Sequence, residues 1–378
     1  MKKITFFISF ISILGFSQTP ITDANFQTAI DVCLSSNPVN GLCSGSQFGP
    51  MPNWDVSQVT DMTGAFKKKT KFNTDISNWD VSNVISMYGM FDMASSFNQD
   101  ISSWAVSDTT IIMYAMFYKA YSFNQDISSW DVSKVVDMRY MFESAISFNQ
   151  GIGSWDVGNV DDMQSMFNRA YSFNQDIGSW DVGEVVDMNA MFYEASSFNQ
   201  NISSWDVENV VDMFAMFWEA TSFDQDISSW DVANVENMAE MFDNSSLSTE
   251  NYDALLKSWS SLNLQQGVIL GAKGVNYCLG EAAMENITDT HGWSISDAGL
   301  NCSEIINKID VYPSPAENHI SLKESEVSVG VTIYNARGKK VITVKNTEKI
   351  ALENLPSGIY TVRISDGVSQ SFKRFIKL

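Results

Sequence analysis

The sequence contains little of what a catalytic or metal-binding site needs. Histidine occurs only at His291 and His319, and no phosphate-binding loop, nucleophile motif or set of metal ligands at a known spacing is present. Basic residues are also scarce, because residues 18–302 hold 10 Lys and Arg against 37 Asp and Glu, a balance of −27. We therefore expect no enzyme activity and no nucleic-acid partner, since so acidic a surface repels polyanions.

Long apolar runs are missing after the first residues. The start, MKKITFFISFISILGFSQ, combines two lysines, an apolar stretch and small residues, which predicts a secretory signal peptide over residues 1–17. No later run approaches the roughly 18 residues of a membrane span, so we expect no transmembrane segment. No cysteine follows the apolar stretch, which argues against a lipoprotein anchor.

Cysteine is limited to four residues, and export makes disulfides permissible. Four cysteines allow three pairings. We favour the local pairs Cys33 with Cys43 and Cys278 with Cys302, each of which would staple one end of the repeated region.

The repeated region is the main feature of the chain. One stretch, FNQDISSWDVSKVVDMRYMF at residues 123–142, recurs with steps of 25 residues and one step of 26. Its tryptophan returns at Trp54, Trp79, Trp104, Trp130, Trp155, Trp180, Trp205 and Trp230. A period of this size indicates a solenoid, in which each unit buries its apolar face against its neighbours.

Two apolar spacings alternate within a unit. Met138, Met141, Phe142 and Ala145 have the offsets of one helical face, which predicts a short helix. The residue before each such helix is placed as an N-cap, as in Asp61, Asp137, Asp162, Asp187 and Asp212. The segment from Trp130 to Val132 predicts a short strand with its aspartate pointing outward. Tryptophan and methionine in this pattern are expected to be core residues.

These patterns predict an α/β solenoid of the leucine-rich-repeat type with helical caps and a small C-terminal antiparallel β-sandwich. The predicted parts are the signal peptide (1–17), an N-terminal cap (18–50), eight repeats (51–246), a C-terminal cap (247–302), a linker (303–309) and the β-sandwich (310–378). We expect a monomer.

The chain resembles two families. The repeat W-D-V-S-x-V-x-x-M-x-x-M-F-x-x-A-x-x-F-N-x-D, with the closing LSTENYDALLKSW and HGWSISDAGLNC, is similar to BspA-like leucine-rich-repeat surface proteins, in the branch shared with mycoplasma surface lipoproteins. The tail, with YPSPAENHISL, VTIYNARGKKV, LPSGIYTVRI and FKRFIKL, resembles the C-terminal sorting domain of type IX secretion in Bacteroidota.

The second resemblance implies delivery by the type IX secretion machinery to the outer surface of a Gram-negative bacterium, or release from it, with the tail usually cleaved. The first implies a surface or secreted binding protein, since several relatives are adhesins. Neither resemblance implies a cofactor.

The candidate binding face is the row of outward aspartates. Neighbouring carboxylates about 4.8 Å apart would repel by roughly 0.9 kcal/mol at a dielectric constant of 80 and about 3.5 at 20. Each carboxylate could simply accept a turn N–H, as in an Asx turn, or the row could hold cations or dock a basic partner. Its members are Asp80, Asp131, Asp156, Asp181, Asp206 and Asp231, preceded by Asp55.

A second row begins at Asp75 and is expected to serve turns, and its neighbours from Asn73 to Asn199 could form a hydrogen-bonded ladder. The leading hypothesis is a protein or polysaccharide ligand bound by the acidic face. A passive structural protein of the surface layer or biofilm, and a Ca²⁺-loaded scaffold, are the alternatives.

Overall fold

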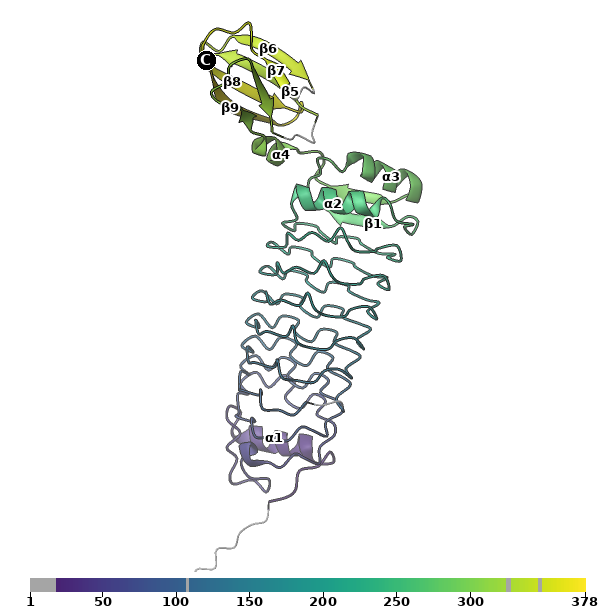
Figure 1. Ribbon diagram of the computed structural model, residues 1–378. Helices are drawn as coiled ribbons and strands as arrows, with labels where there is room; N and C mark the ends of the chain where they lie inside the picture. Colours follow the sequence, from purple (N-terminus) through teal and green to yellow (C-terminus); the bar gives the residue numbers. More distant parts are fainter. Residues whose placement is uncertain (1–17, 107–108, 324–327, 346–348) are drawn as a thin grey trace, which may run out of the picture.

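The computed structural model describes residues 18–106, 109–323, 328–345 and 349–378 (Figure 1). The predicted signal peptide, residues 1–17, lies outside them. The repeats stack into an elongated rod. One end of the rod is capped by α1 and the other by α2 and α3, and a separate β-rich domain follows the second cap. We number the coils 1 to 8 by their tryptophans, from Trp54 to Trp230.

The first coil is covered by helix α1 (Phe26–Ser36), which buries its apolar face, and by the short 3₁₀ helix η1 (Met51–Asn53). The predicted Cys33–Cys43 disulfide is confirmed. Asp23 does not cap α1, since it accepts the backbone N–H of Thr60 at 2.8 Å and that of Asp61 at 3.2 Å. The cap therefore takes up amides that the first coil would otherwise leave exposed.

The short helix predicted in each coil is wrong. Among the described residues of the eight coils there is no α-helix, and the segment from Met138 to Ala145 is a run of turns. Tyr140 and Ser144 lie in the left-handed region, both at φ 57°. The same two positions have positive φ in the neighbouring coils.

Hydrogen bonds between coils explain this choice. The N–H groups of Tyr140, Phe142 and Ser144 donate to carbonyls of the next coil at 2.9, 2.9 and 2.7 Å. The residues between them close tight turns, as when Met141 donates to Met138. A two-turn helix would leave most of its terminal N–H and C=O groups without partners, whereas the stacked turns give both sets of groups a partner.

The predicted strand is also misplaced. The described parallel bridges between coils do not pass through the Trp-Asp-Val segment but through the residues predicted as N-caps. This ladder joins Asp61, Ser86, Ile112, Asp137, Asp162, Asp187, Asp212 and Asn237.

The core consists of columns of identical side chains. Phe142 stacks on Phe167 with ring centroids 5.6 Å apart, and Phe148 on Phe173 at 6.0 Å. The tryptophans are buried as predicted; the indole N–H of Trp180, for example, donates to the Ile152 carbonyl at 3.0 Å. Each fully buried ring stabilises the stack by about 1.5–3 kcal/mol.

The C-terminal cap continues the ladder. Helix α2 (Thr249–Trp259) begins after Ser248, whose hydroxyl accepts the Asn251 N–H. Strand β1 (Ile269–Ala272) bridges to Met238 of coil 8 and pairs in parallel with β2 (Ser294–Asp297). Helix α3 (Glu281–His291) lies between the two strands in the chain, and the predicted Cys278–Cys302 disulfide is confirmed.

The segment predicted as a linker contains helix α4 (Ser303–Lys308). Beyond it, two antiparallel sheets share one apolar core. The first has the order β3-β4-β7 and the second β6-β5-β8-β9. The bounds are β3 Val311–Tyr312, β4 His319–Leu322, β5 Gly330–Asn335, β6 Lys340–Lys345, β7 Lys349–Ala351, β8 Gly358–Ser365 and β9 Gln370–Lys377.

Candidate functional site

The aspartates predicted to face outward form an exposed column, which we call the turn-aspartate column. Each uses a carboxylate oxygen to accept the backbone N–H two residues on, at 3.0 Å for Asp131 and 3.2 Å for Asp156, which closes an Asx turn. The column consists of Asp55, Asp80, Asp131, Asp156, Asp181, Asp206 and Asp231.

At Asp131 and Asp80 the turns favour the charged form of the carboxylate. The Ser133 hydroxyl, together with the Ser133 N–H, keeps the pKa of Asp131 below its usual value, and Ser82 acts in the same way on Asp80. At these two positions the hydrogen bonds of the turn favour the charged carboxylate.

The second predicted row also serves turns. Asp75, Asp100 and Asp126 each accept the N–H of the serine two residues on. Beside them the predicted asparagine ladder is confirmed, since Asn149 N–H donates to Asn124 Oδ1 at 2.9 Å, and the same bond recurs from Asn98 to Asp224. Both rows are therefore parts of the scaffold.

The aspartates predicted as helix N-caps cap no helix, because no helix follows them. They close Asx turns instead, as when Asp187 accepts the Asn189 N–H at 2.7 Å. Because they lie on the parallel ladder, their carboxylates stand directly above one another in adjacent coils. We call Asp137, Asp162, Asp187 and Asp212 the ladder aspartates.

The ladder aspartates are half-buried and sparsely compensated. Arg139 pairs with Asp137 at 2.6 Å and approaches Asp162 at 3.5 Å, and the Asn237 amide donates to Asp212 at 3.1 Å. Burial, and then the carboxylate of the next coil, raise the pKa of Asp162 and of Asp187 above the usual value. Negative charge at this column is therefore less well satisfied than in the turn-aspartate column.

Two exposed or half-exposed columns flank the ladder. The first, just before it in the chain, contains Thr60, Ile85, Ile111, Val136, Asp161, Val186, Val211 and Glu236. The second, two residues after it, contains Thr63, Tyr88, Tyr114, Arg139, Gln164, Asn189, Phe214 and Ala239. The three columns together are called the ladder face.

The ladder face carries exposed apolar side chains. Ile85, Ile111 and Val136 are 46%, 39% and 43% exposed, and backbone hydrogen bonds join the three in series. Tyr88 stacks on Tyr114 at 4.9 Å, parallel to within 10°. Sequence reasoning missed this face, although one signal was present: its residue types change from coil to coil, while the core and turn columns stay nearly constant.

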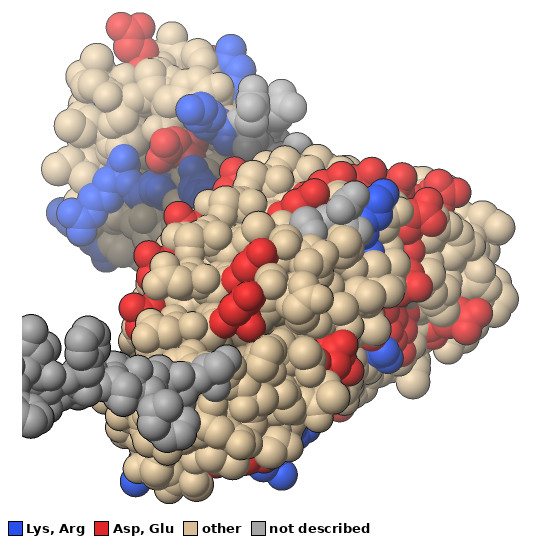
Figure 2. Space-filling model, turned by 90° about the horizontal axis from the view of Figure 1, so that it is seen from below, with Lys and Arg blue, Asp and Glu red and all other residues tan. Residues whose placement is uncertain are grey.

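The rest of the surface is predominantly acidic along the rod. Figure 2 shows Asp and Glu side chains in lines along the solenoid and Lys and Arg gathered on the domain behind it. In the described part of the chain, no three His, Cys, Asp or Glu side chains converge as a metal site would require. None of the helices in the described residues has the length and apolarity needed to cross a bilayer.

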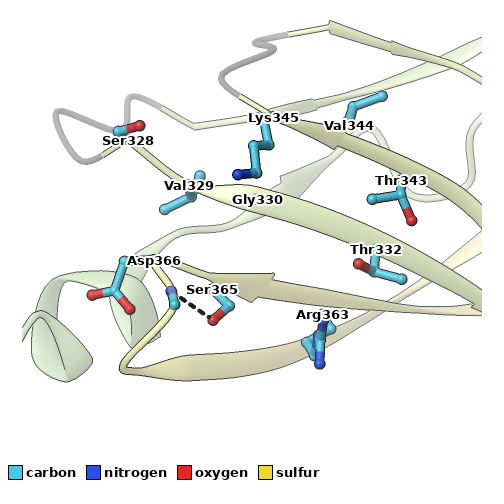
Figure 3. A pocket seen from close by; sticks show the side chains of 11 residues that line it. Ser328, Val329, Gly330, Thr332, Thr343, Val344, Lys345, Arg363, Ser365 and Asp366 are labelled. Carbon is cyan, nitrogen blue, oxygen red and sulfur yellow. Dashed lines mark hydrogen bonds between the residues drawn. The ribbon is translucent and has the colours of Figure 1, made fainter.

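Two other places contain polar groups of the kind that reactive sites use. His291 is buried in the cap, 3.3 Å from the Gln266 amide. A pocket of about 280 Å³ lies on the β5-β6-β8 sheet, lined by Thr332, Thr343 and Arg363 among others (Figure 3). The lining of this pocket also includes Ser365 and Asp366, and the Ser365 hydroxyl donates to the Ser369 carbonyl at 2.6 Å.

Comparison with known proteins gives two family matches. A family described as "Mycoplasma protein of unknown function, DUF285" matches residues 42–152, 108–188 and 144–259. A secretion system C-terminal sorting domain matches residues 310–378, and neither description indicates an enzyme. The sorting domain indicates secretion through type IX machinery, to the cell surface or beyond it. No match was found among curated proteins.

Among solved structures, one similar chain comes from work on PorZ, described as an essential bacterial surface component of the type-IX secretion system of Porphyromonas gingivalis. It is 19% identical, and the alignment covers 21% of this chain and 13% of that one with a TM-score of 0.19. The chain thus spans only a small part of that protein's length, and the likeness carries no argument about fold or function.

Proposed function

Since the chain belongs to the DUF285 family and ends in a secretion sorting domain, we propose that it is a binding protein of the cell surface or its surroundings, with no catalytic role. The rod displays a ligand-contacting surface, and the caps and disulfides keep its ends closed. Adhesion to a host, matrix or polysaccharide surface is the use that this arrangement suits.

The observation that carries the proposal is the ladder face. Positions that build the coil repeat the same residue in nearly every coil, as the phenylalanine and asparagine columns do. The ladder face instead varies and leaves isoleucine, valine and tyrosine exposed side by side. Contiguous exposed apolar side chains on a soluble protein mark an interaction site, so this face, more than the turn-aspartate column, supports binding.

The test is a ligand-array screen of matrix proteins and polysaccharides with three forms of the chain. One is native, and one carries Val136→Asp with Tyr114→Asn, residues that Asp161 and Asn189 already supply at the same positions of other coils. The third carries Asp131→Asn, Asp156→Asn, Asp181→Asn and Asp206→Asn, which keeps a turn acceptor and removes charge. The proposal predicts a ligand that the native and third forms bind and the second does not.

A ligand lost only in the third form would favour a second candidate, a basic partner docked on the turn-aspartate column. The exposure of that column over five successive coils, from Asp131 to Asp231, supports this candidate. If no ligand binds any form, the passive structural protein of a surface layer or biofilm becomes the better account. For the Ca²⁺-loaded scaffold, an unchanged melting midpoint on chelation would remove the hypothesis.

A further inference from the structure

The ladder face is divided by charge along the rod. In coils 2 and 3 all three of its columns are uncharged, with Ile85 and Tyr88 in one coil and Ile111, Ile112 and Tyr114 in the next. From coil 4 onward each coil through coil 7 contributes a carboxylate at the ladder position. Coil 5 adds a second, Asp161.

The carboxylate half has little positive charge of its own. Arg139, at its edge, is the cation of the described ladder face, and its guanidinium is already committed to Asp137 and Asp162. Asp187 accepts the N–H of its own turn and has no cation within ion-pair distance among the described residues. Adjacent half-buried carboxylates of this kind favour a ligand that brings cations.

The apolar half suits a polypeptide better than a sugar. Sugar rings bind aromatic residues by stacking on an exposed ring face, yet the Tyr114 ring is stacked against Tyr88 and lies under the Arg139 guanidinium, 5.1 Å from the ring centroid. The row of Ile85, Ile111 and Val136 offers aliphatic surface, which apolar side chains of a protein cover and hydroxyl groups do not.

The valines of the acidic half fit the same occupant. Val186 is 46% exposed and its N–H donates to the Asp161 carbonyl, so it lies beside the ladder aspartates. Lysine and arginine bury their aliphatic stems on apolar surface while the charged heads stay paired or solvated. Val186 and Val211 can take those stems, and the neighbouring carboxylates can take the heads.

A second copy of this chain is a poor occupant, because it would bring another region with a formal net charge of −27 (residues 18–302) against the acidic half. We propose that the ladder face binds a polypeptide segment of another protein, with apolar side chains over coils 2 and 3 and the adjoining Val136 of coil 4, and lysine or arginine side chains over coils 5 to 7. This assignment rests on the proposed binding function and gives it a ligand class.

The probe for the test is a display library of random peptides, selected on the immobilised full chain. The expected result is enrichment of peptides in which an apolar stretch adjoins lysine or arginine. Individual peptides should then bind the Val136→Asp variant about tenfold more weakly than the native chain, because the substitution puts a charge in the apolar half. They should also bind the Asp187→Asn variant more weakly, because it removes a charge from the acidic half. Tyr88→Asn serves as a second apolar-half variant if Val136→Asp fails to fold.

The matched control is Asp181→Asn, which removes the same charge from the turn-aspartate column of coil 6 and should leave peptide binding unchanged. Absence of enriched peptides, or equal binding by all variants, would overturn the assignment. A polysaccharide in the array screen that depends on Val136 would overturn the ligand class and leave the binding function standing. Self-association of the native chain that Val136→Asp abolishes would assign the face to a second copy.

Discussion

Coil 6 contains two aspartates that look alike in the sequence and differ in the structure. Asp181 and Asp187 both follow the same repeated pattern, and both accept the N–H two residues on, at 3.1 and 2.7 Å. Asp181 is exposed in the turn-aspartate column, whereas Asp187 is half-buried in the ladder with carboxylates above and below. The same hydrogen bond therefore serves two electrostatic settings.

The difference teaches where charge has a cost. In the turn-aspartate column, hydroxyl and amide donors lower the pKa of members such as Asp131, so ionisation of these carboxyl groups stabilises the folded chain. In the ladder, burial raises the pKa of Asp162 and Asp187, so ionisation of these two carboxyl groups destabilises the folded chain. A charge kept at a stability cost is a stronger sign of a binding role than a charge that its own turn requires.

The largest expected effect comes from removing turn acceptors. Replacing Asp131, Asp156 and Asp181 by alanine leaves three turn amides without their partner, at about 0.5–1.5 kcal/mol each. Urea unfolding should show a clearly lower midpoint for this variant, while the matched triple asparagine variant stays close to native. If asparagine destabilises as much as alanine, the column is required for its charge and not for its turns.

A smaller effect of opposite sign is expected in the ladder. Asp187→Asn keeps the turn acceptor, as Asn237 does at the same position of coil 8, and removes a poorly satisfied charge. The variant should unfold at a higher urea concentration than the native chain. Its free energy of unfolding should rise by less than about 1 kcal/mol, because the site is partly solvated. Asp181→Asn is the control and should show no gain; a loss of stability in Asp187→Asn would contradict the comparison.

The smallest effect is the pH dependence that separates the columns. A carboxyl group whose pKa is higher in the folded than in the unfolded chain contributes stability that is lost as the pH rises through the folded pKa. Asp162 and Asp187 have raised pKa values, so acidification from pH 7 should first stabilise the chain through them. Lowered folded pKa values give stability that is lost on further acidification, below about pH 4, as Asp80 and Asp131 protonate. Thermal midpoints across pH 3–7 should show this maximum, and it should be weaker in Asp187→Asn.

Much of the rod could be predicted from the sequence because its period is explicit. Burial of Trp180, the asparagine ladder and both disulfides followed from spacing and from the expected closure of the two ends. The outward direction of Asp131 also followed, since it lies between two inward side chains. These features depend on which way a residue points, which an apolar pattern reports directly.

The helix and the strand were misplaced because the same pattern does not report backbone conformation. Offsets of 0, 3, 4 and 7 fit one helical face, but a run of turns with left-handed residues turns the same side chains inward. Gly64 and Gly89, at φ 62° and 53°, occupy the position of Tyr140 and were the available signal of positive φ. A helix at this place would make the ladder aspartates its N-caps, so the sequence pattern alone points away from them as part of a binding face.

The comparison of the two columns can be measured at single carboxyl groups. Carbon-13 NMR titration of the side-chain carboxyls, with Asp131 and Asp187 assigned through their asparagine variants, reads each pKa in the folded chain. The account predicts a pKa below the ordinary aspartate value of about 3.9 for Asp131 and above it for Asp187. Equal values, or the reverse order, would contradict it.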